Sequence, residues 1–177
     1  DFQLTSSALD GKFDYLVGLS GFTESSDDEL REGVLSRLTA DDVVQIGGSA
    51  PLAHAPKVAL GPGTGLGVAS AVFDGARWVA VPGEGGHVDL APTNDRELAV
   101  VFQLMRERGH VAAEDAVSGL GLENVYLAIA SLDGVKLKAK PIAADIAKAA
   151  RAKTDAVAVE AVALFTGTSA ILQEVAE

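Results

Sequence analysis

The feature of the sequence that most constrains its fold is a change of pattern near residue 94, from short strand-like runs to longer helix-like ones. Strand-like runs cover 57–61, 67–73 and 77–83, and helix-like spacing covers 94–109, 111–119, 121–134 and the Ala-rich stretch 141–177. Asp74-Gly75 between two apolar runs is typical of a β-hairpin. Hairpins followed by helices predict a layered α/β structure.

The helix-like segments carry start and stop signals of their own. Asn94 or Asp95 can cap the segment 94–109, which has apolar residues at 98, 101, 102 and 105 and ends at Gly109. A break near Lys153–Thr154 divides the stretch 141–177. Upstream, 13–22 is interpreted as a short strand and 23–38 as a helix capped by Ser25 or Ser26.

Composition excludes several classes of protein. The 25 acidic against 14 basic residues give a net charge of −11, which argues against nucleic acid or an anionic membrane as the main partner. The chain has no cysteine, so disulfides and thiolate metal sites are excluded and a cytoplasmic location is favoured. No apolar run reaches the roughly 18–20 residues of a membrane span. The first residues do not resemble a signal peptide, and the lack of an initiator Met favours an excerpt or a processed form.

The segment GPGTGLG has glycine at 61, 63, 65 and 67, between two predicted strands. It fits neither the Walker pattern nor the dinucleotide pattern, because no Lys-Ser/Thr follows and a strand comes next. Glycines at a hairpin tip allow backbone N–H groups to approach an anion, and Thr64 adds a hydroxyl. An ordinary glycine-rich turn is the alternative, so phosphate binding stays a hypothesis at this point.

The segment PGEGGHVDLAP places Glu84 and His87 three residues apart among glycines. A carboxylate and an imidazole suit a polyhydroxyl ligand such as a sugar, because both orient hydroxyl groups. A solvated acid and a structural turn histidine are the simpler interpretations. A third interpretation is a metal site, in which His87 and Asp89 join His110 and Glu114, the latter pair on one helical face. Glu114 could equally be a capping acid.

Three long stretches of the sequence resemble one known family. They are LTADDVVQIGGSAPLAHAPKVALGPGTGLGVA (38–69), RWVAVPGEGGHVDLAPTNDRE (77–97) and RGHVAAEDAVSGLGLENVY (108–126). All three resemble the bacterial-type glucokinases, ATP-dependent hexokinases of the sugar kinase/actin/Hsp70 superfamily. The resemblance is nearly continuous from Leu38 to Tyr126 and weakens through the C-terminal helices.

The resemblance implies a fold and a domain organisation. The expected fold is α/β, a partial actin-like ATPase (ribonuclease H-like) sugar-kinase fold with antiparallel β-hairpins followed by helices. Residues 1–37 are expected to form a divergent N-terminal segment with the start of a candidate catalytic helix, and 38–177 part of the large domain. The family's nucleotide loops are expected beyond both chain ends, so the chain is expected to be a fragment of a longer enzyme.

The resemblance also implies roles for individual residues. The expected glucose-binding residues are Glu84, His87, Glu114 and Ser26, and the residues expected to face the nucleotide phosphates are Gly63, Thr64 and Gly65. Counting back without gaps from Leu38 places Ser26-Asp27-Asp28 on the family's Asn-Asp-Phe motif. Asp27 is therefore the candidate catalytic base, and Ser26 replaces an asparagine.

The implied reaction is transfer of a phosphoryl group from ATP, with Mg²⁺, to the 6-hydroxyl of glucose. Polyphosphate stays open as the phosphoryl donor, and a homodimer is expected from the resemblance alone. Two other functions also stay open. One is an inactive sugar-binding or scaffolding remnant, suggested by the missing loops and Ser26. The other is a metal-dependent hydrolase that uses His87, Asp89, His110 and Glu114.

Overall fold

The computed structural model describes residues 54–81 and 83–176. The described residues fall into two compact units, each considered by itself. The first contains 54–61, 67–81, 83–85 and 170–176, and the second contains 62–66 and 86–169. The predicted strand at 13–22 and helix at 23–38, with Ser26 and Asp27, lie outside the described residues. Within the described part, no helix combines the length and the apolar character that a membrane crossing requires.

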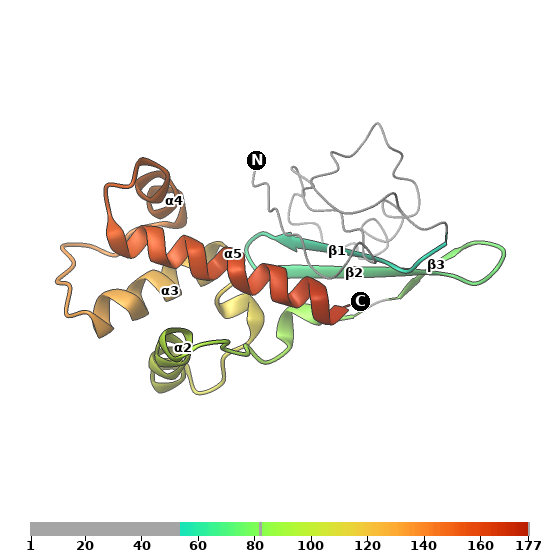
Figure 1. The fold of residues 1–177 in the computed structure, drawn as a ribbon, viewed down its shortest axis with the longest axis horizontal. Helices are drawn as coiled ribbons and strands as arrows, with labels where there is room; N and C mark the ends of the chain where they lie inside the picture. The colour runs from blue at the N-terminus through green and yellow to red at the C-terminus, as the bar shows by residue number, and fades with distance from the viewer. Residues whose placement is uncertain (1–53, 82, 177) are drawn as a thin grey trace. The chain divides into compact units, whose positions relative to one another are not determined.

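The hairpin region forms a three-stranded sheet in the order β1-β2-β3 (Figure 1). Its strands are β1 (Lys57–Pro62), β2 (Leu66–Phe73) and β3 (Trp78–Val81). Strands β2 and β3 are antiparallel, with a register that runs from Ser70 opposite Val81 to Phe73 opposite Trp78. All three predicted strands are confirmed, with ends that differ by one or two residues.

The turn between β2 and β3 confirms the predicted Asp-Gly hairpin, with a loop of four residues, 74–77. The Asp74 carboxylate accepts hydrogen bonds from the backbone N–H groups of Ala76 and Arg77, each at 2.8 Å. These bonds, that from Arg77 first, lower the pKa of Asp74. Gly75 adopts a positive φ of 99°, which few residues with a Cβ tolerate.

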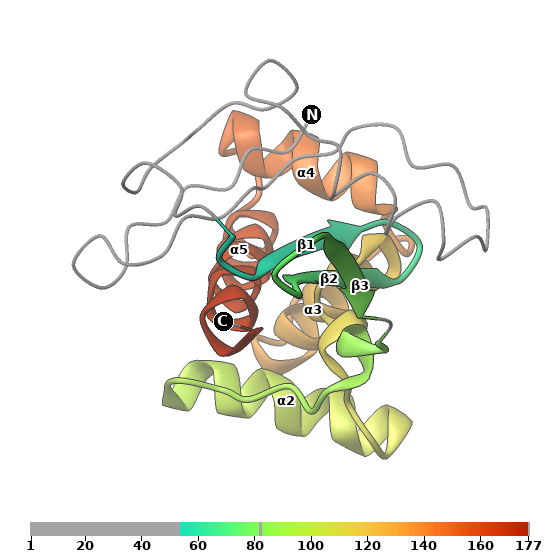
Figure 2. The same ribbon diagram turned by 90° about the vertical axis from the view of Figure 1, so that its right-hand side faces the viewer.

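Four α-helices follow the sheet in sequence: α2 (Asp95–Arg108), α3 (Gly119–Leu132), α4 (Ala143–Ala152) and α5 (Ala156–Ala176). In the second unit, α3 lies between α2 and α4 (Figure 2). The side chains that fill this layer are almost fully buried: Val100 and Leu104 of α2, Val125 and Ile129 of α3, Ile146 of α4, and Ala158 and Ala161 of α5. Helix α3 is therefore the centre of the core of this unit.

The predicted helix boundaries at 94–109 and the break at 153 are confirmed. The Asn94 side chain accepts a hydrogen bond from the Glu97 backbone N–H at 2.9 Å, as an N-cap does. Gly109 ends the helix with a φ of 87°, and its N–H donates to the Met105 carbonyl. Lys153 takes the left-handed conformation between α4 and α5.

The predicted helix at 111–119 is wrong, because only a 3-10 turn at Ala113–Asp115 forms there. Two side chains in this segment form hydrogen bonds with the backbone that compete with a continuous α-helix. Asp115 accepts from the Ala112 N–H at 2.9 Å, and Ser118 caps α3 by accepting from the Gly121 N–H at 2.8 Å. His110 and Glu114 consequently do not share a helical face.

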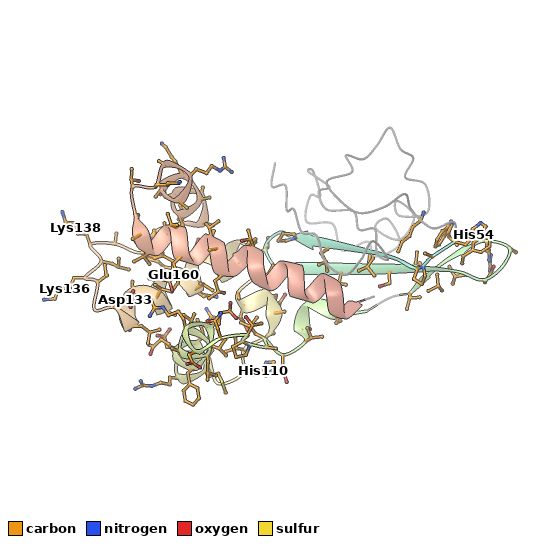
Figure 3. All side chains as sticks on the ribbon, viewed as in Figure 1. His54, His110, Asp133, Lys136, Lys138 and Glu160 are labelled. Carbon is orange, nitrogen blue, oxygen red and sulfur yellow. The ribbon has the colours of Figure 1, made fainter. Side chains whose placement is uncertain are left out.

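Arg96 joins three helices of the second unit. Its Nη2 donates to Asp133 Oδ2 at 2.8 Å, where α3 ends, and its Nε donates to Glu160 Oε1 of α5 at 2.6 Å. Figure 3 labels both acceptor residues at one end of the helical layer. The guanidinium therefore ties α2 to both neighbouring helices.

Candidate functional site

A short backbone pairing in the second unit assembles the candidate site. Asp89 and Ala112 form an antiparallel bridge. The Ala113 N–H donates to the Val88 carbonyl at 2.8 Å, and the Leu90 N–H donates to the Val111 carbonyl at 3.2 Å. This pairing places position 87, just before Val88, beside position 114, just after Ala113.

Those two residues are His87 and Glu114, both predicted to bind sugar hydroxyls. His87 Nε2 lies 3.1 Å from Glu114 Oε1. The His87 side chain is 61% exposed and that of Glu114 is 33% exposed, so the pair is open to a ligand. The structure therefore brings together an imidazole and a carboxylate that are 27 positions apart in the sequence.

The tip of the glycine-rich hairpin lies against the same carboxylate. The Leu66 N–H donates to Glu114 Oε2 at 3.4 Å. A Cβ atom added at Gly65 would lie 2.7 Å from that oxygen, and one added at Gly86 would lie 2.3 Å from the Leu66 carbonyl oxygen. Glycine is thus required at Gly86, where a side chain would meet backbone atoms, whereas a side chain at Gly65 would displace the Glu114 carboxylate.

The hairpin tip also contacts the start of α3. The Gly119 N–H, at the first position of this helix, donates to the Gly63 carbonyl at 2.8 Å. Ser118, the N-cap, donates from its hydroxyl to the Glu114 carbonyl at 2.7 Å. A helix N-terminus carries partial positive charge, which favours an anion nearby. The exposed residues 63 and 64 therefore lie where a phosphate group would be attracted.

The four residues of the metal hypothesis form two pairs instead of one cluster. His87 pairs with Glu114, and His110 Nε2 lies 2.7 Å from Asp89 Oδ1, with both of these side chains largely exposed. In the part of the chain that the structure describes, no group of three or more His, Cys, Asp or Glu side chains is placed to hold a metal ion. The four-ligand arrangement of the metal hypothesis is thus not what the fold produces in this part of the chain.

The other predicted site residues have different outcomes. Glu84 is exposed and belongs to the first unit, whereas His87 belongs to the second. Ser26 and Asp27 lie outside the described residues. Sequence reasoning missed Ser118 and Gly119, which link Glu114 to the hairpin tip. The signal available for them was the Ser-Gly pair just before a helix-like run, which is typical of an N-cap.

Comparison with known proteins identifies a single family. The glucokinase family model matches residues 33–174, which is most of the chain. A glucokinase from Mesorhizobium japonicum is 41% identical over 151 residues, which make up 84% of this chain and 43% of the relative. A glucokinase from Klebsiella pneumoniae is 52% identical over 97 residues, 55% of this chain and 30% of the relative. The chain spans less than half the length of these relatives.

Solved structures agree with the sequence matches. A glucokinase from an Antarctic psychrotroph superposes with a TM-score of 0.65 at 29% identity, covering 72% of this chain and 39% of that one. A glucokinase from Balamuthia mandrillaris, solved in complex with glucose, superposes with a TM-score of 0.55 at 26% identity, covering 71% and 35%. The α/β sugar-kinase fold is thereby confirmed, and the chain belongs to the glucokinase family.

Proposed function

We propose that the protein acts in the ATP-dependent phosphorylation of glucose at its 6-hydroxyl, as part of a longer enzyme. The observation that carries the proposal is Glu114, whose two carboxylate oxygens contact His87 and the hairpin tip. One side chain thereby joins the candidate sugar-binding residues to the candidate phosphate-binding loop. A relative solved with glucose and the glucokinase family match support the same reaction.

The finer fold and domain assignments belong to this proposal. We assign the chain to the actin-like ATPase class of sugar kinases, with 38–177 as part of the large domain and 1–37 as a divergent segment that contains the start of the catalytic helix. The cytoplasm is the compartment that a reaction consuming ATP and glucose implies.

On the sugar side, we assign hydroxyl binding to Glu84, His87 and Glu114, with a further contact from Ser26. A carboxylate accepts hydrogen bonds from two hydroxyl groups and so fixes the orientation of a hexose. The contact with His87 and the Leu66 N–H holds the Glu114 carboxylate in one orientation before the sugar arrives. Such preorganisation lowers the free-energy cost of positioning the 6-hydroxyl for transfer.

On the nucleotide side, we assign phosphate contacts to Gly63, Thr64 and Gly65. A Cβ atom added at Gly63 would meet no atom within 4 Å, so a ligand has room beside this residue. The Gly63 N–H itself donates to the Gly65 carbonyl at 2.8 Å. The N-terminus of the 14-residue helix α3 supplies partial positive charge beside it. These residues fit a phosphate chain, and Mg²⁺ bound to that chain would neutralise part of its charge.

The proton of the 6-hydroxyl needs an acceptor, and we assign this role to Asp27. The assignment rests on the similarity of Ser26-Asp27-Asp28 to the family's motif. General base assistance typically contributes about 10²–10⁴-fold to a rate. Asp27→Asn should therefore lower kcat far more than it changes glucose affinity.

Calorimetric titration of the purified protein with glucose tests the sugar site. Glu114→Gln keeps the shape of the side chain and removes its charge, so we expect at least a tenfold loss of glucose affinity, about 1.4 kcal/mol. Glu107→Gln, a change of the same chemistry at an exposed residue of α2, is the matched control and should bind like the unmodified protein. Equal glucose affinity in both variants would remove Glu114 from the site.

A coupled assay for ADP formation separates the kinase from the sugar-binding remnant. Glucose-dependent ADP formation that Asp27→Asn abolishes supports the kinase. Glucose binding without ADP formation supports the remnant instead. Absence of both from a folded protein would overturn the proposed function.

A further inference from the structure

Two small polar side chains are buried in the part of the chain that the structure describes, and both belong to the first turns of α3. Ser118, the N-cap, is 2% exposed, and Asn124 is 7% exposed. Burying a hydroxyl or an amide costs free energy unless the group forms hydrogen bonds. Asparagine is also a poorer helix former than leucine. Neither the apolar core nor the helix therefore explains why an amide stands at position 124.

The two ends of the Asn124 amide have different partners. Its Oδ1 accepts a hydrogen bond from Arg108 Nη2 at 2.6 Å, and its Nδ2 donates to the Asp115 carbonyl at 3.2 Å. A guanidinium can only donate, and a backbone carbonyl can only accept. The site therefore needs a side chain with an acceptor at one end and a donor at the other. Neither a carboxylate nor an aliphatic side chain can form the second of these bonds.

Both buried side chains bond to the short turn that carries Glu114. The Glu114 carbonyl accepts a hydrogen bond from the Ser118 hydroxyl at 2.7 Å. The next carbonyl along the chain, that of Asp115, is the one that accepts from Asn124. The Asp115 carboxylate is held as well, because its Oδ1 accepts from Arg108 Nη1 at 3.3 Å. The backbone that follows Glu114 is thus fixed to α3 and to the end of α2.

We propose that Asn124 is a positioning residue for sugar binding, which acts through Glu114. The inference rests on the proposed function, in which the Glu114 carboxylate binds glucose hydroxyls. His87 and the Leu66 N–H contact the end of the Glu114 side chain, whereas Asn124 holds the backbone from which that side chain extends. A binding group has to be held within about 0.5 Å of its productive position. Without the bond from Asn124, the turn is free to shift and takes the carboxylate with it.

A positioning role and a purely structural role have different consequences for glucose binding. Loss of a structural contact lowers stability but leaves the glucose affinity of the folded protein unchanged. Loss of a positioning contact weakens glucose binding, and does so only while the Glu114 side chain is present to be positioned. Comparing two single variants with the double variant therefore separates the two roles.

Calorimetric titration with glucose of Asn124→Leu, Glu114→Ala and the double variant tests the proposal. Asn124→Leu removes both bonds of the amide and should weaken glucose binding about threefold to tenfold, the range expected for one hydrogen bond. In the Glu114→Ala background the same substitution should change the affinity by less than about twofold, because the group that it positions is gone. Ile129→Val, which removes one buried methylene group farther along α3, is the matched control and should lower Tm without changing glucose affinity.

A second variant, Asn124→Asp, keeps the volume and the oxygen that faces Arg108 and replaces only the donor to the Asp115 carbonyl. It should weaken glucose binding in the same way, and far-UV circular dichroism checks that each variant is folded. Unchanged glucose affinity in a folded Asn124 variant, or an equal loss with and without the Glu114 side chain, overturns this inference and leaves the sugar site in place. Failure of both Asn124 variants to fold would assign the residue a structural role and overturn the inference as well. Absence of glucose binding by the unmodified protein would overturn the proposed function, and the inference with it.

Discussion

Replacing Gly121 by alanine should destabilise the protein, although the same change stabilises most helices. Alanine in a helix interior is favoured over glycine by about 0.8–1.0 kcal/mol. At Gly121, however, the new Cβ atom would lie 2.6 Å from the Ala116 carbonyl carbon and 2.7 Å from the Glu114 carbonyl oxygen. Both are backbone atoms, which cannot rotate away as the end of a side chain can.

The size of the destabilisation follows from comparing the steric cost of the added Cβ atom with the gain in helix propensity. Forcing extra volume into a well-packed site costs about 1–3 kcal/mol, which outweighs the gain in helix propensity. Alanine keeps the N–H group that donates to Ser118, so the helix cap is not the cause of any loss. Relief of the clash also has to move the Glu114 backbone, so glucose affinity should fall together with stability.

Gly167→Ala is the matched control, because Gly167 lies within α5 and an added Cβ meets no atom within 4 Å. It should stabilise the protein by about 1 kcal/mol. In a chain of this size 1 kcal/mol shifts Tm by about 2–4 °C, so differential scanning fluorimetry should show the two variants moving in opposite directions. A Tm for Gly121→Ala equal to or above that of the unmodified protein would refute the steric reasoning.

Two further predictions concern hydrogen bonds of the helical layer. Burial, followed by the hydrogen bond to Asp155, raises the pKa of Tyr126 to about 12 from its ordinary value of 10.0. The unfolded chain then loses this proton first, so stability should fall as pH rises from about 10 to about 12, and Tyr126→Phe should flatten that slope in denaturant titrations. Arg96→Met should cost about 0.5–1 kcal/mol, because Arg96, Asp133 and Glu160 are all more than a third exposed and solvent screens them. The loss should shrink in about 1 M salt, and a salt-independent loss would point to packing instead.

The sequence was sufficient for features that depend on neighbouring residues. Asn94 caps a helix through the N–H three positions later, and Gly109 ends it through its own backbone conformation. The turn at Asp74-Gly75 is equally local, because its hydrogen bonds join residues two and three positions apart. The apolar positions 98, 101, 102 and 105 indicated a helix but not which side of it is buried, because Val100 and Leu104, which are buried, were not among them. Val101 is buried, whereas Phe102 beside it is exposed.

Only the tertiary structure decided which distant residues meet. The contact between His87 and Glu114 depends on the pairing of Asp89 with Ala112, and the sequence carries no signal for that register. The same pairing places Asp89 beside His110 and so divides the four residues of the metal hypothesis into two pairs. Local hydrogen bonds are specified by residues a few positions apart, whereas the pairing of distant segments is decided by the packing free energy of the whole unit. For this reason the sequence alone indicated the family, the turn at Asp74-Gly75 and the helices other than the one predicted at 111–119, and the fold determined which acid meets which imidazole.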